Sequence, residues 1–220
     1  MAMFFNHFKL AWRNLRKNRV YSFINIFGLT AGLSCFLLIA LYIFDELTFD
    51  QFHINAKSIY RVIDTRTSKS GKESKLASVA FNISEQGQKV LPEINNAVRF
   101  VIFGRNNVFG KDKTHPINES YNVASSAFFK VFSFPILHGD PVTSFKDPHT
   151  VVLRDETAIA LFGKTDVVGS SIDAEGDSIP FKVVAVVHIP SNSHLQFNIL
   201  YSESTFMPRT IWISSLFYWE

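Results

Sequence analysis

A chain of 220 residues is long enough for one sizeable domain plus an anchor, and it is too short for two full domains. Hydrophobic residues make up 47% of the chain and charged residues 19%, which is apolar for a soluble protein of this size, and the excess is concentrated in one segment. The net charge of +3 comes from a basic N-terminal arm, so it does not indicate a nucleic-acid-binding surface. The single cysteine, Cys35, excludes an intrachain disulfide.

The first segment, residues 1–19, is basic and has apolar residues at helical spacing. Its charged residues are all cations: Lys9, Arg13, Arg16, Lys17 and Arg19. Four apolar residues fall on one helical face: Phe5, Phe8, Trp12 and Leu15. This pattern predicts an amphipathic helix lying in a membrane interface, and a disordered basic arm is the alternative. Trp12 is of the type that sits at headgroup level, and the cations favour anionic lipid.

The second segment, Val20 to Phe44, contains no charged residue. As a helix of about 25 residues it would be about 37 Å long, enough to cross a hydrocarbon core of about 30 Å with some tilt. Cations on its N-terminal side predict that this side is cytoplasmic. A cleaved signal peptide is the rival interpretation. The run is too long for one, and it ends in the bulky stretch Ala40 to Phe44 where small residues are needed.

Two glycines one turn apart, Gly28 and Gly32, form a G-x-x-x-G pair inside this apolar run. Small residues at that spacing let a second helix approach closely. We therefore expect these two residues to form a helix-packing seam.

The remainder, residues 45–220, has the pattern of a globular domain. Strands are predicted for residues 59–63, 75–81, 97–103, 108–109, 119–124, 150–154 and 181–187. Helices are predicted for residues 83–91, 126–132 and 155–162. Asp155 is expected to cap the last helix and Gly163 to stop it. Strands outnumber helices and the helices are short, so the predicted fold class is α+β.

Catalytic and cofactor motifs are missing from the sequence. Ala158 to Thr165 matches a loose phosphate-loop pattern, but its middle residues are those of a helix end and not of a glycine-rich turn. The histidines form no H-x-x-x-H or H-E-x-x-H pair, and there is no G-x-S-x-G elbow. His188 and His194 bracket a polar loop and are expected to be surface residues. No cofactor or metal and no enzymatic activity are predicted.

Several blocks resemble one family of membrane proteins. Phe8 to Leu33 looks like the start of MacB/FtsX-type ABC transporter permeases. Asp45 to His53 and Ile59 to Val62 are similar to the family's entry into its periplasmic core domain, and Phe128 to Asp140 and Ile189 to Phe197 follow in the right order. The resemblance covers nearly the whole chain.

This resemblance implies a division and a function. Residues 1–19 would be a cytoplasmic arm, 20–44 a transmembrane helix, and 45–220 a periplasmic MacB-like core domain of a bacterial inner-membrane protein. The chain would serve as a permease subunit of an exporter, driven by a partner ABC ATPase and paired with another permease copy. A periplasmic adaptor is a further partner that such an assembly admits. Family members continue into further transmembrane helices, so we expect this sequence to be a fragment of a longer permease.

The alternative from a different class is a single-pass periplasmic sensor or ligand-binding protein. Such a protein needs an intracellular output module, and fewer than about 20 residues precede the apolar run. This shortage disfavours signalling by the chain itself, although a partner could supply the output.

Overall fold

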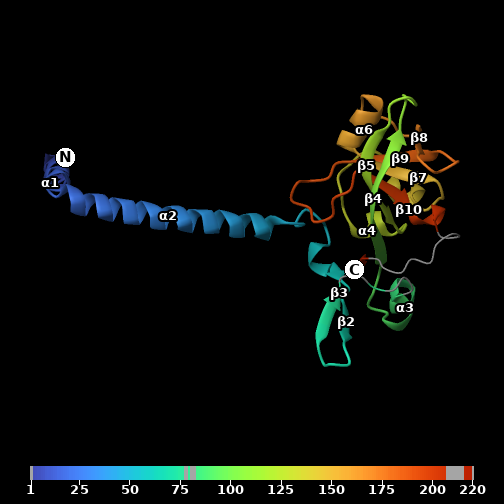
Figure 1. Ribbon diagram of the computed structural model, residues 1–220, viewed down its shortest axis with the longest axis horizontal. Coiled ribbons are helices and arrows are strands. Elements are labelled where there is room, and N and C mark those ends of the chain that lie inside the picture. Colours follow the sequence, from blue (N-terminus) through green and yellow to red (C-terminus); the bar gives the residue numbers. More distant parts are fainter. Residues whose placement is uncertain (1, 77–78, 80–82, 207–215, 220) are drawn as a thin grey trace. The chain divides into compact units, whose positions relative to one another are not determined.

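The chain folds into two compact units, Met1–Phe49 and Asp50–Glu220 (Figure 1). We call them the helical unit and the sheet unit. The computed structural model describes residues 2–76, 79, 83–206 and 216–219. Each unit is described separately below.

The helical unit consists of α1 (Ala2–Lys17) and α2 (Arg19–Thr48). Asn18 separates them with φ −110° and ψ 60°, outside the α-helical region. α2 is almost entirely apolar and has no buried residue. By length and hydropathy it is the one helix in the described part of the chain that could cross a membrane. The helix ends where the N–H of Phe49 bonds to the carbonyl of Glu46.

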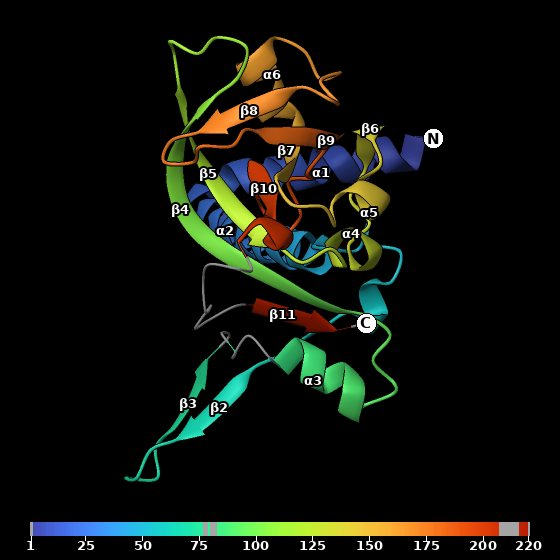
Figure 2. The same cartoon turned by 90° about the vertical axis from the view of Figure 1, so that its right-hand side faces the viewer.

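The sheet unit is built on a nine-stranded mixed sheet with the order β1-β11-β4-β5-β10-β7-β9-β6. The bounds along this path are β1 (Tyr60–Arg61), β11 (Leu216–Trp219), β4 (Ala97–Phe109), β5 (Ile117–Ala124), β10 (Ile199–Ser202), β7 (Thr150–Arg154), β9 (Phe181–Val187) and β6 (Ile136–Gly139). Off the path, β8 (Ser171–Ala174) pairs with both β4 and β9. A separate hairpin joins β2 (Asp64–Thr67) to β3 (Glu73–Leu76). The long, curved β4 and the projecting β2–β3 hairpin are visible in Figure 2.

Strand β8 closes the sheet on itself. Its pairings with β4 and β9 complete a ring of strands that runs β4-β5-β10-β7-β9-β8 and back to β4. Within this ring β5 and β10 are parallel, as are β7 and β9. Closure removes free edges from these strands, and β6 and β1 remain at the two ends of the path.

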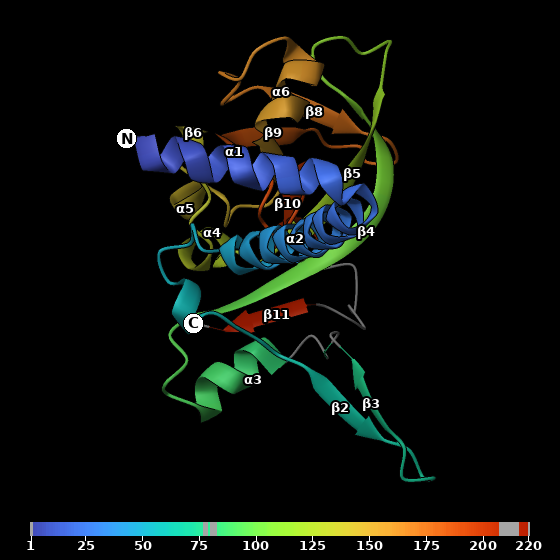
Figure 3. The ribbon, with the colours of Figure 1, turned by 90° about the vertical axis from the view of Figure 1, so that its left-hand side faces the viewer.

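Short helices pack against the strands, and the four α-helices among them, α3 to α6, are labelled in Figure 3. Their bounds are η1 (Ala56–Ser58), α3 (Ile83–Val90), α4 (Phe128–Val131), α5 (Pro141–Ser144), α6 (Asp155–Phe162) and η2 (Glu203–Thr205). In α6, Asp155 and Glu156 occupy the first turn, where carboxylates interact favourably with the positive end of the helix dipole. The helix ends at Gly163, whose φ of 75° is left-handed.

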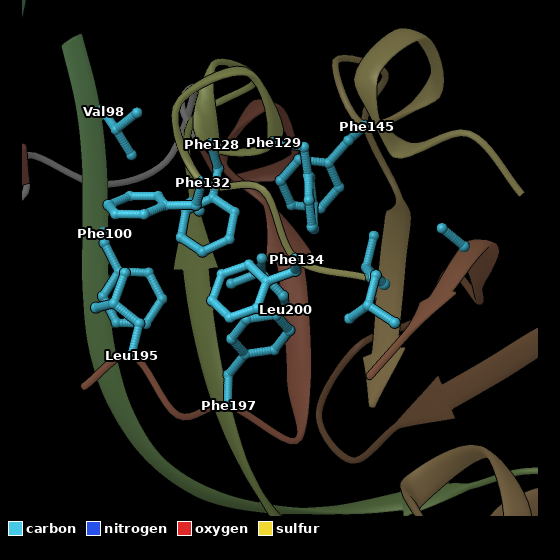
Figure 4. Close-up of a cluster of buried hydrophobic side chains, with 14 of the residues drawn as sticks. Val98, Phe100, Phe128, Phe129, Phe132, Phe134, Phe145, Leu195, Phe197 and Leu200 are labelled. Atoms are coloured by element: carbon cyan, nitrogen blue, oxygen red, sulfur yellow. The ribbon is translucent and has the colours of Figure 1, made fainter. Parts of the chain in front are cut away.

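Side chains that alternate along the strands contribute to two hydrophobic clusters. In β7, Val151 and Leu153 belong to one cluster and Val152 to the other, because successive side chains point to opposite faces. The first cluster is rich in phenylalanine: Phe100, Phe128, Phe129, Phe132, Phe134, Phe145 and Phe197 (Figure 4). The rings of Phe128 and Phe134 stack with centroids 5.9 Å apart, and that of Phe197 meets Phe128 edge-on at 5.8 Å.

The predicted α+β class is confirmed, and most predicted elements are present. The strands at 119–124, 150–154 and 181–187 correspond to β5, β7 and β9, and the helix at 83–91 corresponds to α3. Of the strand predicted for residues 59–63 only Tyr60–Arg61 is a strand, β1, and it pairs with β11, whereas the hairpin is formed by β2 and β3. Residues 77–78 and 80–82, part of the predicted return strand and of the segment before α3, lie outside the described residues.

Two expectations are corrected by the structure. The segments 97–103 and 108–109 form one strand, β4, whose register shifts between Ile102 and Arg105. Polar residues after Gly104 looked like a turn, yet they continue the ladder with β5 across a β-bulge. Asp155 is the first residue of α6 and not its cap; Arg154 holds the cap position without a side-chain hydrogen bond.

Candidate functional site: the membrane helix and the start of the sheet unit

The predicted interface residues lie on α1 and at its junction with α2. Lys9, Arg13, Arg16, Lys17 and Arg19 are all exposed, as is Trp12. Arg16 and Lys17 occupy the last turn of α1, where the negative end of the helix dipole favours cations. The structure brings Trp12, Arg16 and Arg19 together around one hollow at the bend between the helices, whereas Arg13 and Lys17 line a neighbouring one. The side chains of Phe5 and Phe8 lie outside the described ones.

The predicted packing seam, Gly28 and Gly32, lies one turn apart on α2. A Cβ added at either position would meet no atom within 4 Å. Nothing within the described part of this chain therefore requires glycine at these positions, and α2 has the geometry to accept a close neighbour there. That role stays a prediction.

The chain starts the sheet unit at Asp50, immediately after the residue that ends α2. Asp50 has a φ of 55°, a left-handed conformation that aspartate tolerates better than most residues. Its backbone N–H donates to the carbonyl of Asn192 at 2.9 Å. Its carboxylate accepts hydrogen bonds from the backbone N–H of His194 at 3.0 Å and from the Nδ1 of His194 at 2.8 Å. One acidic residue thus fixes the start of the unit to the loop 190–197.

That loop is itself anchored in the core. Ile189, Leu195 and Phe197 are all buried in the phenylalanine-rich cluster. Between them, Ser193 is 3% exposed, and its hydroxyl bonds to the carbonyl of Leu195. Because both ends of the loop are buried, Asp50 is attached to a rigid part of the domain.

His53, three residues after Asp50, forms the second attachment. It is 5% exposed and lies against the rings of Phe52, Phe132 and Phe134, with centroid distances of 4.1, 5.3 and 5.2 Å. Its Nδ1 accepts the backbone N–H of Ser133 at 3.1 Å, so the neutral ring carries its proton on Nε2. Burial lowers the pKa of His53 below 6.5, and the nearby Asp50 carboxylate partly opposes this.

Neither the attachment through His53 nor the pairing of Asp50 with His194 was predicted from the sequence. A histidine among phenylalanines has no spacing signal, and the two partners are far apart in the chain. His188 and His194 are half-exposed or more, as expected of surface residues, and each contacts a carboxylate: His188 Nδ1 lies 2.7 Å from Asp155. A small pocket of about 160 Å³ borders Asp50, His53 and His194.

The described residues contain no cluster of three His, Cys, Asp or Glu side chains that could hold a metal ion. The loose phosphate-loop pattern falls on α6 and its left-handed glycine stop, Gly163. A phosphate loop needs its glycine turn before a helix, and here the helix precedes the glycine. The geometry agrees with the interpretation of this stretch as a helix end.

An apolar helix long enough to span a bilayer is followed in the chain by a mixed α+β domain, which is the organisation of a membrane-anchored protein. Residues 22–217 match the sequence profile of the MacB-like periplasmic core domain, and the chain belongs to that family. It is homologous to the periplasmic domains of MacB-like ABC transporter permeases. No curated protein matches the chain.

Solved structures share the fold. A domain of a putative permease protein from Porphyromonas gingivalis aligns with a TM-score of 0.61 at 19% identity, covering 74% of each chain. The extracellular domain of the noncanonic ABC-type transporter YknZ from Gram-positive bacteria gives 0.54 at 14% identity, covering 74% of this chain and 82% of that one. The periplasmic region of MacB from Actinobacillus actinomycetemcomitans gives 0.52 at 14% identity, with 74% and 72% covered.

Proposed function

We propose that the chain is a permease subunit, or part of one, of an ABC-type exporter. Residues 1–19 lie at the cytoplasmic face, residues 20–44 cross the bacterial inner membrane, and the part from residue 45 onward is periplasmic. A partner ABC ATPase hydrolyses ATP in the cytoplasm, and this chain itself catalyses nothing. A second permease copy and a periplasmic adaptor complete the assembly.

The observation that carries this proposal is the short link in the chain between α2 and the sheet unit. Only Phe49 separates Thr48, the last residue of α2, from Asp50. Asp50 and His53 then attach the chain to buried parts of the domain, through His194 and Ser133. A link of one residue leaves little free chain between the membrane helix and the first fixed residue of the domain, as a device driven from the cytoplasm requires. Membership of the MacB-like family supports the same conclusion.

The test lengthens this link with flexible residues. The chain is tagged in its native cells and purified with its partners, with Cys35→Ser and Ser70→Cys to place one fluorophore on the exposed β2–β3 turn. We expect an ATPase subunit to copurify and ATP to change the fluorescence. Inserting Gly-Gly-Ser-Gly after Thr48 should abolish this change while the ATPase subunit stays bound, because a flexible linker does not transmit a small displacement.

The matched control inserts the same four residues after Gly176, a surface turn with open space around it. This control should respond to ATP like the parent. Equal responses of all three proteins would contradict coupling through the helix–domain link. Purification without any ATPase, together with a small molecule bound to the sheet unit, would instead support the sensor or ligand-binding alternative.

A further inference from the structure

The bend between α1 and α2 forms a hollow of about 630 Å³ with chemically distinct linings. Trp12, Leu15, Phe23 and Ile26 line it with apolar surface, and all four are largely exposed. Arg16 and Arg19 line it with guanidinium groups. Its volume is in the range of cavities that hold an organic ligand, about 300–1,000 Å³.

The bend is held in shape by side chains that bond to the last turn of α1. Arg19 Nε donates to the carbonyl of Arg16 at 3.3 Å, and the hydroxyl of Ser22 donates to the carbonyl of Leu15 at 3.2 Å. These carbonyls belong to a helix end, where intrahelical donors are lacking. The same bonds keep α2 close to α1, so Arg16 and Arg19 border one space.

The positive charge at this hollow is not neutralised by the adjoining sequence. The first acidic residue of the chain is Asp45, at the far end of the apolar run. Guanidinium groups bind phosphate through paired, charge-assisted hydrogen bonds. A second copy of this helix pair would bring the same cations into the hollow and be repelled, whereas an anion would be attracted.

The order of the lining residues along α2 matches the order of chemical groups in a phospholipid. Arg19 is the first residue of α2, and Phe23 and Ile26 follow about 6 and 10 Å further along the axis. A phosphate at the polar boundary of a bilayer is followed by glycerol and then by acyl chains at similar depths. Trp12 is of the type found at that boundary.

We infer that this hollow binds one anionic phospholipid, with its phosphate between Arg16 and Arg19 and the start of its acyl chains against Phe23 and Ile26. The inference shares with the proposed function only the premise that α2 spans a bilayer. Its test measures lipid binding and needs no ATPase, so the two ideas fail separately.

The experiment measures lipids retained by the purified full chain. The chain is taken from bilayers of phosphatidylglycerol and phosphatidylcholine into detergent, and bound lipids are counted by native mass spectrometry. We expect one retained phosphatidylglycerol. In Arg16→Gln/Arg19→Gln its binding relative to phosphatidylcholine should fall about tenfold. The matched control, Lys9→Gln/Arg13→Gln, removes the same charge from residues that do not line the hollow and should change it less than about threefold.

Three outcomes would overturn the inference. Equal losses in the two double variants would show attraction by the arm's total charge and not by a site. No loss in either would show that the arginines do not hold the lipid. Displacement of phosphatidylglycerol by millimolar inorganic phosphate would show a bare phosphate site in which the apolar lining plays no part, since acyl-chain contacts should make the whole lipid much harder to displace.

Discussion

At the scale of single residues, the polar contacts that hold the sheet unit together could not be predicted from the sequence. In the sequence, Asp50 is one of several acidic residues after the apolar run, and His53 is an isolated histidine. Arg99, in the otherwise apolar first half of β4, forms a buried ion pair with Glu203 at 2.5 Å and also bonds to Ser84. Such partners are brought together by tertiary folding over long sequence distances, so no local spacing predicts them. The interface role of the cations of α1 could be predicted from their position beside an apolar run, and it stays a prediction.

The buried His53 makes the stability of the chain depend on pH in a defined direction. Burial lowers its pKa below 6.5, so on acidification the unfolded chain takes up the proton before the folded chain does. The stabilisation is fully present above pH 6.5 and is lost as pH falls toward the lowered pKa. Between about pH 7.5 and pH 5, the wild type should therefore lose more free energy of unfolding than His53→Phe, which retains an aromatic ring among Phe52, Phe132 and Phe134.

Chemical unfolding of the full chain in detergent, followed by circular dichroism at several pH values, measures this difference. His53→Gln serves as a second variant, because it cannot be protonated but disturbs the packing differently. The two variants should differ in absolute stability and agree in their dependence on pH. If the free energy of unfolding of both variants changed with pH as it does in the wild type, the role assigned to His53 would be disproved.

At the scale of elements, continuous apolar or β-branched runs were predictable and the strands of four residues were not. β7 and β9 are such runs and were found as predicted. β6, β8 and β10 have four residues each, and they become strands because longer neighbours supply the pairing. β4 was predicted as two pieces because Gly104 and the polar residues after it resemble a turn. In the folded chain β5 supplies partners across that stretch, and tertiary pairing overrides local propensity.

One glycine is required by a β-bulge in the neighbouring strand. Between β7 and β9 the register shifts so that Val151 faces Val183 and Val152 faces Ala185, which leaves Val184 as the extra residue. Gly139 of β6 lies opposite this irregularity, with φ 86°, and a Cβ there would be 2.2 Å from the carbonyl oxygen of Val184. Only a residue without a side chain fits this position.

Gly139→Ala should therefore destabilise the sheet unit strongly. The matched control is Gly176→Ala, at φ 89° but with no atom within 4 Å of the added Cβ. The control should cost about 1–2 kcal/mol for its left-handed backbone alone. Gly139→Ala should cost at least about 2 kcal/mol more, because the carbonyl of Val184 cannot move without breaking the bulge. Equal midpoints of chemical unfolding for the two variants would refute the close approach.

At the scale of the whole molecule, the sequence divides the chain by composition, and the structure consists of a helical unit and a sheet unit. Absence of charge from Val20 to Phe44 is a property of composition, so it could be read without any knowledge of contacts. The closed ring of strands depends on β8 meeting both β4 and β9, and no sequence pattern encodes that meeting. The resemblance to a family predicted the domain type, which periodicity alone did not, because the family's sequence blocks occur in this chain in the same order.

We expect the predicted helix-packing residues, Gly28 and Gly32, to act in assembly. Since a Cβ at Gly28 or Gly32 meets nothing within 4 Å, Gly28→Leu or Gly32→Leu should leave the folded chain intact. In a membrane, a leucine there would keep a partner helix from approaching, so either substitution should weaken association with a second permease copy about tenfold. Association is measured by copurification of two differently tagged copies from the same membrane, or by energy transfer between them.

Thr30→Leu provides the comparison for that measurement. It adds a similar side chain to α2 on the face opposite the two glycines, because a residue two positions along a helix is turned by about 200°. This variant should associate like the parent. If Gly28→Leu, Gly32→Leu and Thr30→Leu all associate equally well, close packing at the glycines is not what holds the copies together. If all three fail alike, added bulk anywhere on α2 disrupts assembly and the seam has no special place in it.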